Sequence, residues 1–197
     1  MKKLKIKEKE FDKNKFKELV LYIATKCESN AYYGATKLNK ILFFSDFIAH
    51  EEIGESITGA DYFALEHGPA PRLLKPIQEQ MQKAGEIAIE QRTRQVRTIA
   101  LREPKLDSFS AAEIAIVDEV IKALCDRNAN EVSDMSHGFL GWKAAWTESQ
   151  ATRRSVSIPY DTVFVSNPHM DEYEKAIGLE KAKKYGWIAE KKSPVRV

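Results

Sequence analysis

The residues of this chain whose types could carry out chemistry do not form a familiar catalytic or metal-binding pattern. None of the four histidines (His50, His67, His137 and His169) is followed by another three or four positions later, and CxxC and HExxH do not occur. The spacing of a dedicated zinc site is therefore missing. GxxxxGK(S/T), GxGxxG and GxSxG are missing too, which removes the usual phosphate-binding loop and nucleophile elbow. We expect no metal and no cofactor.

Ser136 and His137 place a nucleophile type next to a base type. Neighbours on a helix point about 100° apart, so these two side chains do not form a nucleophile–base pair with each other. A Ser–His–Asp site would have to be assembled from distant segments around Ser136 or His137. A hydrolase of that kind is the least favoured hypothesis, and we expect that the protein is not an enzyme.

Asp46 is the most unusual ionisable residue, because it lies in the otherwise apolar stretch 36–52. The favoured interpretation is a buried structural anchor, hydrogen-bonded to a Tyr hydroxyl or a backbone N–H. The alternative places Asp46 with Asn39 and His50 on an exposed stripe that contacts a partner. A catalytic role is a minor third interpretation.

His67-Gly68-Pro69-Ala70-Pro71 forms a rigid corner. Gly68 can take a positive φ, and Pro69 fixes the direction in which the chain leaves. Pro69 and Pro71 are expected to exclude a regular strand and to lead into a helix that begins at about Pro71. The corner therefore turns the chain, although its prolines and His67 could also form part of a docking surface.

A central helix at about 36–53 should position these residues. At about 100° per residue, its apolar side chains cover well over half of the circumference; they are Leu38, Ile41, Leu42, Phe44, Phe47, Ile48 and Ala49. A surface helix shows a narrower stripe, so this helix should be buried on several sides. Gly34 provides a break before it, Thr36 a candidate N-cap and Gly54 a C-terminal stop.

The fold class is predicted to be mainly α (α+β), a compact multi-helix domain around the central helix with one small β-hairpin at about 86–102. Apolar spacing predicts further helices at about 12–28, 71–84, 110–127, 128–139, 141–149 and 171–191, and an extended or irregular segment at 157–167. Ser110 and Glu113 have the spacing of a capping box. The hairpin is predicted from the alternation in EIAIEQ and VRTIAL, and the arginines near its link (Arg92, Arg94 and Arg97) are expected in a solvated loop.

Length and composition suit one cytoplasmic domain. The chain has 197 residues, of which 43% are hydrophobic, and no stretch approaches the roughly 18 apolar residues of a membrane span. The N-terminus lacks the apolar core of a secretory signal. Cys27 and Cys125 are expected to be two free thiols rather than a disulfide.

Both ends of the chain are basic, whereas its body is acidic. Residues 1–17 carry eight lysines against three acidic residues, and residues 180–197 carry six basic against two acidic residues. These ends contribute +5 and +4 to a total of +2, so the residues between them sum to −7. Solubilising termini are the plainer interpretation, and nucleic-acid binding is the alternative, although an acidic body argues against a broad basic face.

Three blocks carry the distinctive residues: KLNKILFFSDF (37–47), ITGADYFALEHGPAP (57–71), and MSHGFLGWKAAW (135–146) followed by SIPYD (157–161). In this order and spacing they resemble the Panacea domain family of SocA-like antitoxins over about residues 15–165. The matching positions are Lys37, Leu38, Lys40, Leu42, Phe44, Asp46, Gly59, His67, Gly68, Pro69, Ser136, His137 and Trp142.

The resemblance implies an antitoxin domain of bacterial or phage toxin–antitoxin systems, mostly helical with a small β element. Such domains are thought to bind and neutralise toxins of unrelated folds, and one studied branch presents its toxin to a protease. No catalytic residues are implied. We therefore expect a cognate toxin protein as the partner, bound by direct contact, with a cellular protease as a second candidate partner and a homo-oligomer left open. The alternative is a nucleic-acid-binding regulator of a toxin–antitoxin or phage operon that uses the basic termini.

The expected organisation is a basic lead-in (1–14), a Panacea-like domain (15–165), and a C-terminal helix with a basic tail (166–197). A tight interface needs an apolar or aromatic anchor with a polar rim. The candidate anchors are Tyr32, Tyr33, Phe43 and Trp142, and the candidate surrounding residues are Lys40, Asp46, His50, His67 and Arg72. Specificity for one toxin is expected in the basic ends or in the hairpin.

Overall fold

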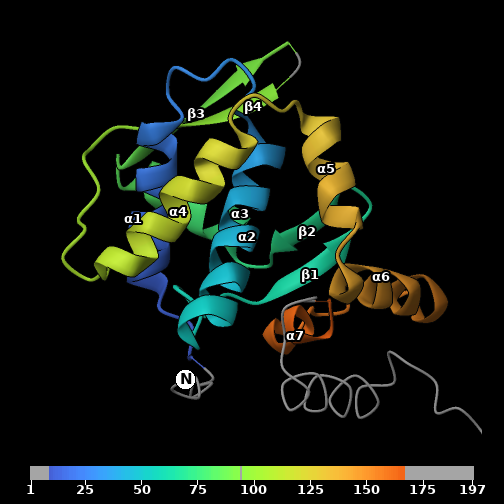
Figure 1. Cartoon of the computed structure of the whole chain (residues 1–197). Coiled ribbons are helices and arrows are strands. Elements are labelled where there is room, and N and C mark those ends of the chain that lie inside the picture. Colours follow the sequence, from blue (N-terminus) through green and yellow to red (C-terminus); the bar gives the residue numbers. More distant parts are fainter. Residues whose placement is uncertain (1–8, 94, 167–197) are drawn as a thin grey trace, which may run out of the picture.

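The fold is seen in a computed structural model that describes residues 9–93 and 95–166 (Figure 1). Its helices are α1 (Lys13–Lys26), α2 (Ala35–Ile53), α3 (Leu74–Lys83), α4 (Ala111–Leu124), α5 (Ala129–His137), α6 (Leu140–Thr152), the 3-10 helix η1 (Tyr160–Thr162) and α7 (Val163–Ser166). Its strands are β1 (Tyr62–Leu65), β2 (Gly68–Pro71), β3 (Ile87–Arg92) and β4 (Gln95–Ala100). The mainly α fold class is confirmed.

Helix α2 is the centre of the domain, as its wide apolar surface predicts. It packs against α1, α4, α5, α7, β2 and β4, and Figure 1 shows it enclosed by them. Leu38, Ile41, Leu42 and Phe47 are almost fully buried. Gly54 ends the helix with φ 86°, as predicted. The predicted N-cap is wrong: the cap position is Gly34, which offers no side-chain hydrogen bond.

A strand through the Gly-Pro corner is the main correction to the predicted fold. β1 and β2 form an antiparallel hairpin in which Pro69 lies opposite Ala64 and Pro71 opposite Tyr62. Arg72 N–H donates to Asp61 O, and in an antiparallel ladder the hydrogen-bonded pairs alternate. Pro69 and Pro71 therefore occupy positions whose missing N–H would point away from β1. Proline is tolerated at such edge positions, so it did not exclude the strand.

The chain after α6 covers the other edge of β1. Ala64 N–H donates to Val156 O, and Ile158 N–H donates to Tyr62 O, which places 156–158 beside the hairpin. The segment predicted to be extended or irregular (157–167) is extended only at its start, because residues 160–166 form η1 and α7. The predicted helix at 171–191, and the residues of the basic termini at 1–8 and 180–197, lie outside the described residues.

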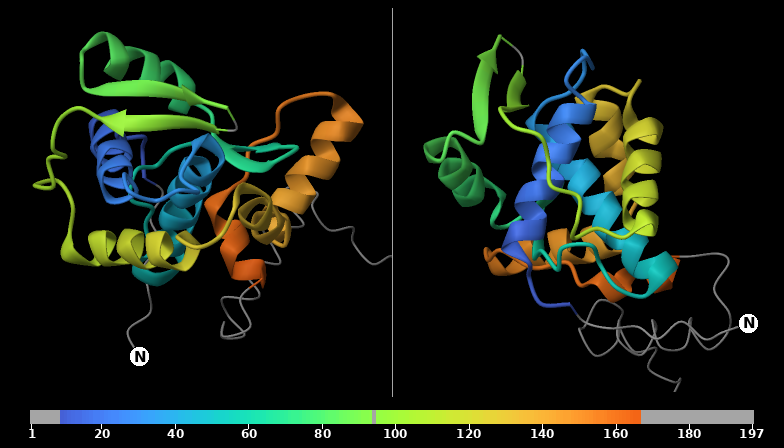
Figure 2. Two further views of the ribbon diagram at one scale, coloured as in Figure 1. Left: turned by 90° about the horizontal axis from the view of Figure 1, so that it is seen from above. Right: turned by 90° about the vertical axis from the view of Figure 1, so that its left-hand side faces the viewer.

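The hairpin predicted at about 86–102 is present as β3 and β4, paired from Ile87↔Ala100 to Arg92↔Gln95. It lies over the upper ends of α1 and α2, with β4 on the side of α1 and β3 on the side of α3 (Figure 2). Arg102 fixes its base by donating to Glu18 at 2.6 Å and to Glu86 at 2.8 Å. Arg97 contradicts the expectation of a solvated loop, because it is buried in β4 beside the ring of Tyr33.

Local capping explains where several helices begin. Asp12 caps α1, and the predicted Ser110–Glu113 capping box is present at α4. Asn128 and Glu131 form a second box at α5. Helix α3 begins at Leu74 rather than Pro71, because the strand β2 occupies the proline positions. Cys27 and Cys125 are free thiols, as predicted, and no described helix is long and apolar enough to cross a membrane.

Candidate functional site

The favoured interpretation of Asp46, a buried structural anchor, is confirmed. Its carboxylate is fully buried and accepts hydrogen bonds from Thr58 N–H at 2.7 Å, Thr58 Oγ1 at 2.5 Å and Tyr62 OH at 2.7 Å. Burial raises the pKa of the Asp46 carboxyl, because the protein interior solvates the charged form poorly. Asp46 therefore holds the 54–62 segment against α2 and does not reach a partner.

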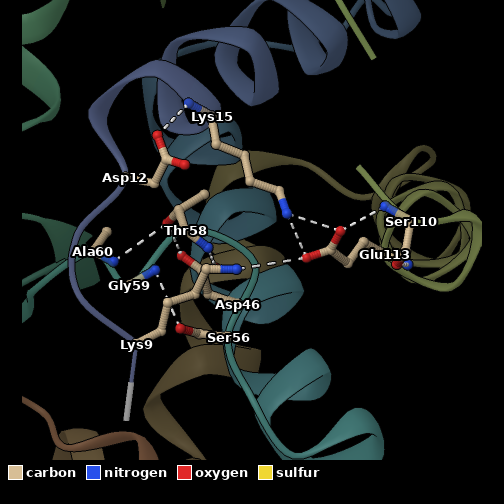
Figure 3. Close-up of polar contacts among 10 residues, drawn as sticks. All are labelled: Lys9, Asp12, Lys15, Asp46, Ser56, Thr58, Gly59, Ala60, Ser110 and Glu113. Atoms are coloured by element: carbon tan, nitrogen blue, oxygen red, sulfur yellow. Dashed lines mark hydrogen bonds and ion pairs between the residues drawn. The ribbon is translucent and has the colours of Figure 1, made fainter. Parts of the chain in front are cut away.

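The chain before α1 is tied to this anchor. Asp12 N–H donates to Thr58 O at 2.8 Å, so residues 9–12 lie over the turn that binds Asp46 (Figure 3). Glu113 on α4 pairs with Lys15 at 2.7 Å and with Lys9 at 3.8 Å. These contacts join α1, α2 and α4 at the lower end of the domain, which makes residues 9–12 part of the packed structure.

The three blocks that carry the family resemblance meet at the β1–β2 turn. Lys40 on α2 is 2% exposed and donates to Pro69 O at 3.0 Å; burial lowers the pKa of its ammonium to about 7. Gly68 has φ 93°, and a Cβ there would lie 2.3 Å from Ser136 Oγ on α5. Trp142 on α6 donates from Nε1 to Leu65 O at 3.1 Å. The shared residues thus pack a hairpin between three helices.

The Ser-His pair belongs to the same packing. Ser136 is fully buried, and its hydroxyl donates to Ser133 O at 2.7 Å. The Ser133 hydroxyl in turn donates to His67 O at 3.2 Å. The ring of His137 stacks on Trp142 at a centroid distance of 4.1 Å. A buried hydroxyl of this kind is not presented to a substrate.

His50 connects α2 to the chain after α6. It is buried, and its Nε2 lies 2.9 Å from Asp161 Oδ1. The rings of Tyr160 and Phe164 lie against the imidazole at 5.4 and 5.5 Å. His50 therefore holds η1 and α7 on the central helix.

The nine candidate partner-binding residues do not form one surface. Six of them are buried, so a partner that docks on the outside of the domain does not reach most of their side-chain surface: Tyr33, Lys40, Phe43, Asp46, His50 and Trp142. The alternative interpretation, an exposed stripe of Asn39, Asp46 and His50, is therefore wrong, since the last two are in the interior. Trp142 is 8% exposed, whereas Tyr32, His67 and Arg72 are exposed. Periodicity within α2 could not distinguish an exposed face from one covered by β2, α5 and α7.

A groove of about 890 Å³ lies between the two hairpins, and we call it the hairpin groove. Its walls come from the start of α2, from β1 and β2, from α3, and from one face of the β3–β4 hairpin. Among the residues that line it are Leu38, Asn39, Phe63, Leu65, Pro71, Arg72, Leu74, Gln78, Ile89, Gln91, Val96 and Thr98. Its walls are mainly apolar side chains with amide and hydroxyl groups between them, a composition suited to binding.

Arg72 forms a fixed wall of the hairpin groove. Its guanidinium donates to Asp61 Oδ2 at 2.6 Å and to Ser155 Oγ at 2.8 Å, and it lies 4.8 Å from the centroid of the Phe63 ring. Of the nine candidates, Arg72 is the one that lines this groove. The other lining residues were not identified as a site from the sequence. Alternation marked Ile89 and Val96 as strand residues, but nothing local showed that their face meets β1 and α2.

Comparison with curated proteins and with solved structures found no match. A family model described as "Antitoxin SocA-like, Panacea domain" matches residues 38–143. The match runs from the start of α2 to the start of α6, so it includes the β1–β2 turn, the three helices that enclose it, and the hairpin groove. It covers more than half of the chain and agrees with the resemblance in the three sequence blocks. The chain belongs to the family of SocA-like antitoxins with a Panacea domain.

Proposed function

We propose that this protein is an antitoxin that neutralises a cognate protein toxin by direct contact, and that it does so without catalysis. The observation that carries the proposal is the hairpin groove, a large and mainly apolar depression on a domain of an antitoxin family. Specific protein interfaces combine apolar anchors with a polar rim. The groove offers both, since Leu65 is 42% exposed at one wall and Arg72, Lys75 and Glu79 lie around it.

A binding function without chemistry is supported by what the polar residues of the family blocks do. Asp46 binds the backbone and hydroxyl of Thr58, Lys40 binds the Pro69 carbonyl, and Ser136 binds the Ser133 carbonyl. Each of these groups is buried and used in holding the fold. Transfer of the bound toxin to a cellular protease would be an added step, and the test is whether the toxin's half-life in cells shortens when this protein is present.

The experiment is co-expression with the product of the adjacent open reading frame, scoring growth and co-purification. Leu65→Glu is compared with Leu101→Glu, which puts the same change at an exposed leucine outside the groove. We expect the wild type and Leu101→Glu to restore growth and to co-purify with the toxin, and Leu65→Glu to lose both. If a folded Leu65→Glu variant still restores growth, the groove is not part of the interface with the toxin. Direct neutralisation would be contradicted if the product of the adjacent open reading frame does not arrest growth. It would also be contradicted if growth is restored but the two proteins form no complex.

A further inference from the structure

The backbone of β3 has one edge that is not paired within residues 9–93 and 95–166. β3 and β4 form a two-stranded sheet, and Leu101 N–H donates to Glu86 O at 2.9 Å. Because hydrogen-bonded pairs alternate in an antiparallel ladder, this bond shows which opposite residues of β3 and β4 form hydrogen-bonded pairs and which do not. Ala88 and Glu90 direct their N–H and C=O groups towards β4. Ile89 and Gln91 direct theirs outwards, away from β4.

The outer edges of the other described strands are covered. Residues 156–158 lie along β1. The outer edge of β2 has no N–H at Pro69 or Pro71, and the Pro69 carbonyl accepts from Lys40. The edge of β4 lies against the loop before α2, where Gln95 Nε2 donates to Ala31 O at 3.1 Å. β3 lies on the side of the hairpin away from α1, where α3 packs against it without pairing with its backbone edge (Figure 2). An unpaired edge is a template for another strand.

The open edge and the hairpin groove are continuous. Ile89 and Gln91, whose backbone groups point outwards, also line the groove with their side chains, together with Val96 and Thr98 across the hairpin. A strand that pairs with β3 would therefore place every second side chain on the groove side of the sheet. Main-chain hydrogen bonds supply affinity in this mode of recognition, and the pockets for alternate side chains supply specificity.

The side chains around this surface select the kind of segment that fits. The charged residues lining the groove are Arg72, Lys75 and Glu79, and those lining the adjoining cleft, which shares Ala35, Gln91 and Val96 with it, are Lys37 and Arg92. Arg72 pairs with Asp61, Arg92 pairs with Glu90, and Lys37 is 1% exposed and donates to Cys125 O, so these three cations are already engaged. The groove side of the sheet carries Ile89 and Val96, which favours a segment with apolar side chains at every second position.

We propose that the toxin is held by strand addition: an extended toxin segment with apolar residues at every second position pairs with β3 and fills the hairpin groove. This inference rests on the proposed antitoxin function. The occupant is a segment of the toxin, and the tests below distinguish it from a second copy of this chain at the same edge.

The first test uses the wild-type protein and needs no substitution. Amide hydrogen exchange is measured by NMR for the free protein and for its complex with the growth-arresting product of the adjacent open reading frame. We expect exchange at Ile89 and Gln91 to slow at least tenfold in the complex, whereas Ala88 and Glu90, already bonded to β4, should change little. Unchanged exchange at Ile89 and Gln91 in a formed complex would overturn strand addition.

The second test removes one outward N–H. Gln91→Pro deletes the donor on the open edge without removing a bond to β4, and Gln91→Ala removes the same side chain but keeps the donor. We expect the dissociation constant for the toxin to rise more than tenfold for Gln91→Pro and less than threefold for Gln91→Ala. Equal binding by both, with native circular dichroism, would overturn the proposal.

The outcomes separate this inference from the proposed function. If wild-type protein forms no complex with the toxin, the proposed function fails and strand addition fails with it. If the complex forms and Leu65→Glu breaks it, but Gln91→Pro does not, the antitoxin function stands and strand addition is wrong. If the free protein is a dimer whose Ile89 and Gln91 amides are already protected, β3 is an interface between copies of this chain, which also contradicts the proposal.

Discussion

The Lys40 ammonium lies in the interior of the domain and donates to the Pro69 carbonyl oxygen at 3.0 Å. A buried lysine of this kind is costly, because the interior solvates its charge poorly. It joins the central helix to the proline strand at the point where α5 also packs, since a Cβ on Gly68 would touch both Lys40 and Ser136. The sequence placed Lys40 at the rim of an interface, whereas the structure makes it a support of the β1–β2 hairpin.

The first prediction concerns the pH dependence of stability. Burial lowers the pKa of Lys40 to about 7, below the ordinary value of 10.5 that the unfolded chain has. Between these values the unfolded state binds more protons, so the free energy of unfolding should rise with pH, by at most about 1.4 kcal/mol per pH unit. Lys40→Met lacks this contribution.

Urea unfolding of both proteins at pH 7, 8 and 9 measures the effect. The difference in free energy of unfolding, wild type minus Lys40→Met, should increase across this range, and other titrating groups cancel in the difference. A constant difference would show that Lys40 keeps its charge in the folded state. Lys40→Glu is expected to unfold the domain, because its carboxylate would face the Pro69 carbonyl oxygen.

The second prediction concerns Asp46. Asp46→Ala leaves the Thr58 N–H and the Tyr62 hydroxyl buried without their acceptor. We expect a loss of about 3 kcal/mol in the free energy of unfolding, within the range for groups left unpaired in the interior. Asp107→Ala, at an exposed turn, is the control and should change stability by less than about 0.5 kcal/mol. Equal thermal midpoints for the two variants would contradict the anchoring role.

The third prediction separates backbone strain from close packing at Gly68. Gly68 and Gly85 both have positive φ, at 93° and 70°, but a Cβ at Gly85 meets nothing within 4 Å. Gly85→Ala should therefore cost about 1 kcal/mol, from backbone strain alone. Gly68→Ala should cost at least about 2 kcal/mol more, because its Cβ would also overlap Ser136 Oγ and Lys40 Cε. Chemical denaturation of the two variants decides the matter, and equal losses would show that Ser136 and Lys40 move aside freely.

The fourth prediction concerns Arg72 as a wall of the hairpin groove. Arg72→Glu places a carboxylate beside Asp61 and removes the stacking on Phe63, so the wall should open and lose its contact with the toxin segment. We expect toxin affinity to fall about tenfold or more, read as a faster dissociation rate. Arg127→Glu is the matched control, because Arg127 is exposed, follows α4, and donates to the carbonyl of Ala123 at the end of that helix. Equal affinities of the two folded variants would place Arg72 outside the interface.

The elements whose signals are local could be predicted from the amino-acid sequence. Helical periodicity identified α1, α2 and α4, and Ser110 with Glu113 located the start of α4, because a cap acts within one turn. Alternation located β3 and β4. Asp46 was foreseen as an anchor because a carboxylate in an apolar helix needs buried donors. The three blocks also indicated the family, which residues 38–143 confirm.

The neighbours of each element could not be predicted in this way, because they depend on how distant segments pack together. Pro69 and Pro71 argued against a strand until the register placed both at positions that give no hydrogen bond to β1. Tyr33, Phe43 and His50 have the composition of an interface, but helices and hairpins far away in the chain cover them. The hairpin groove joins residues from α2, β1, β2, α3, β3 and β4. Its shape depends on contacts between distant segments, and such contacts leave no period or motif at any one position of the sequence.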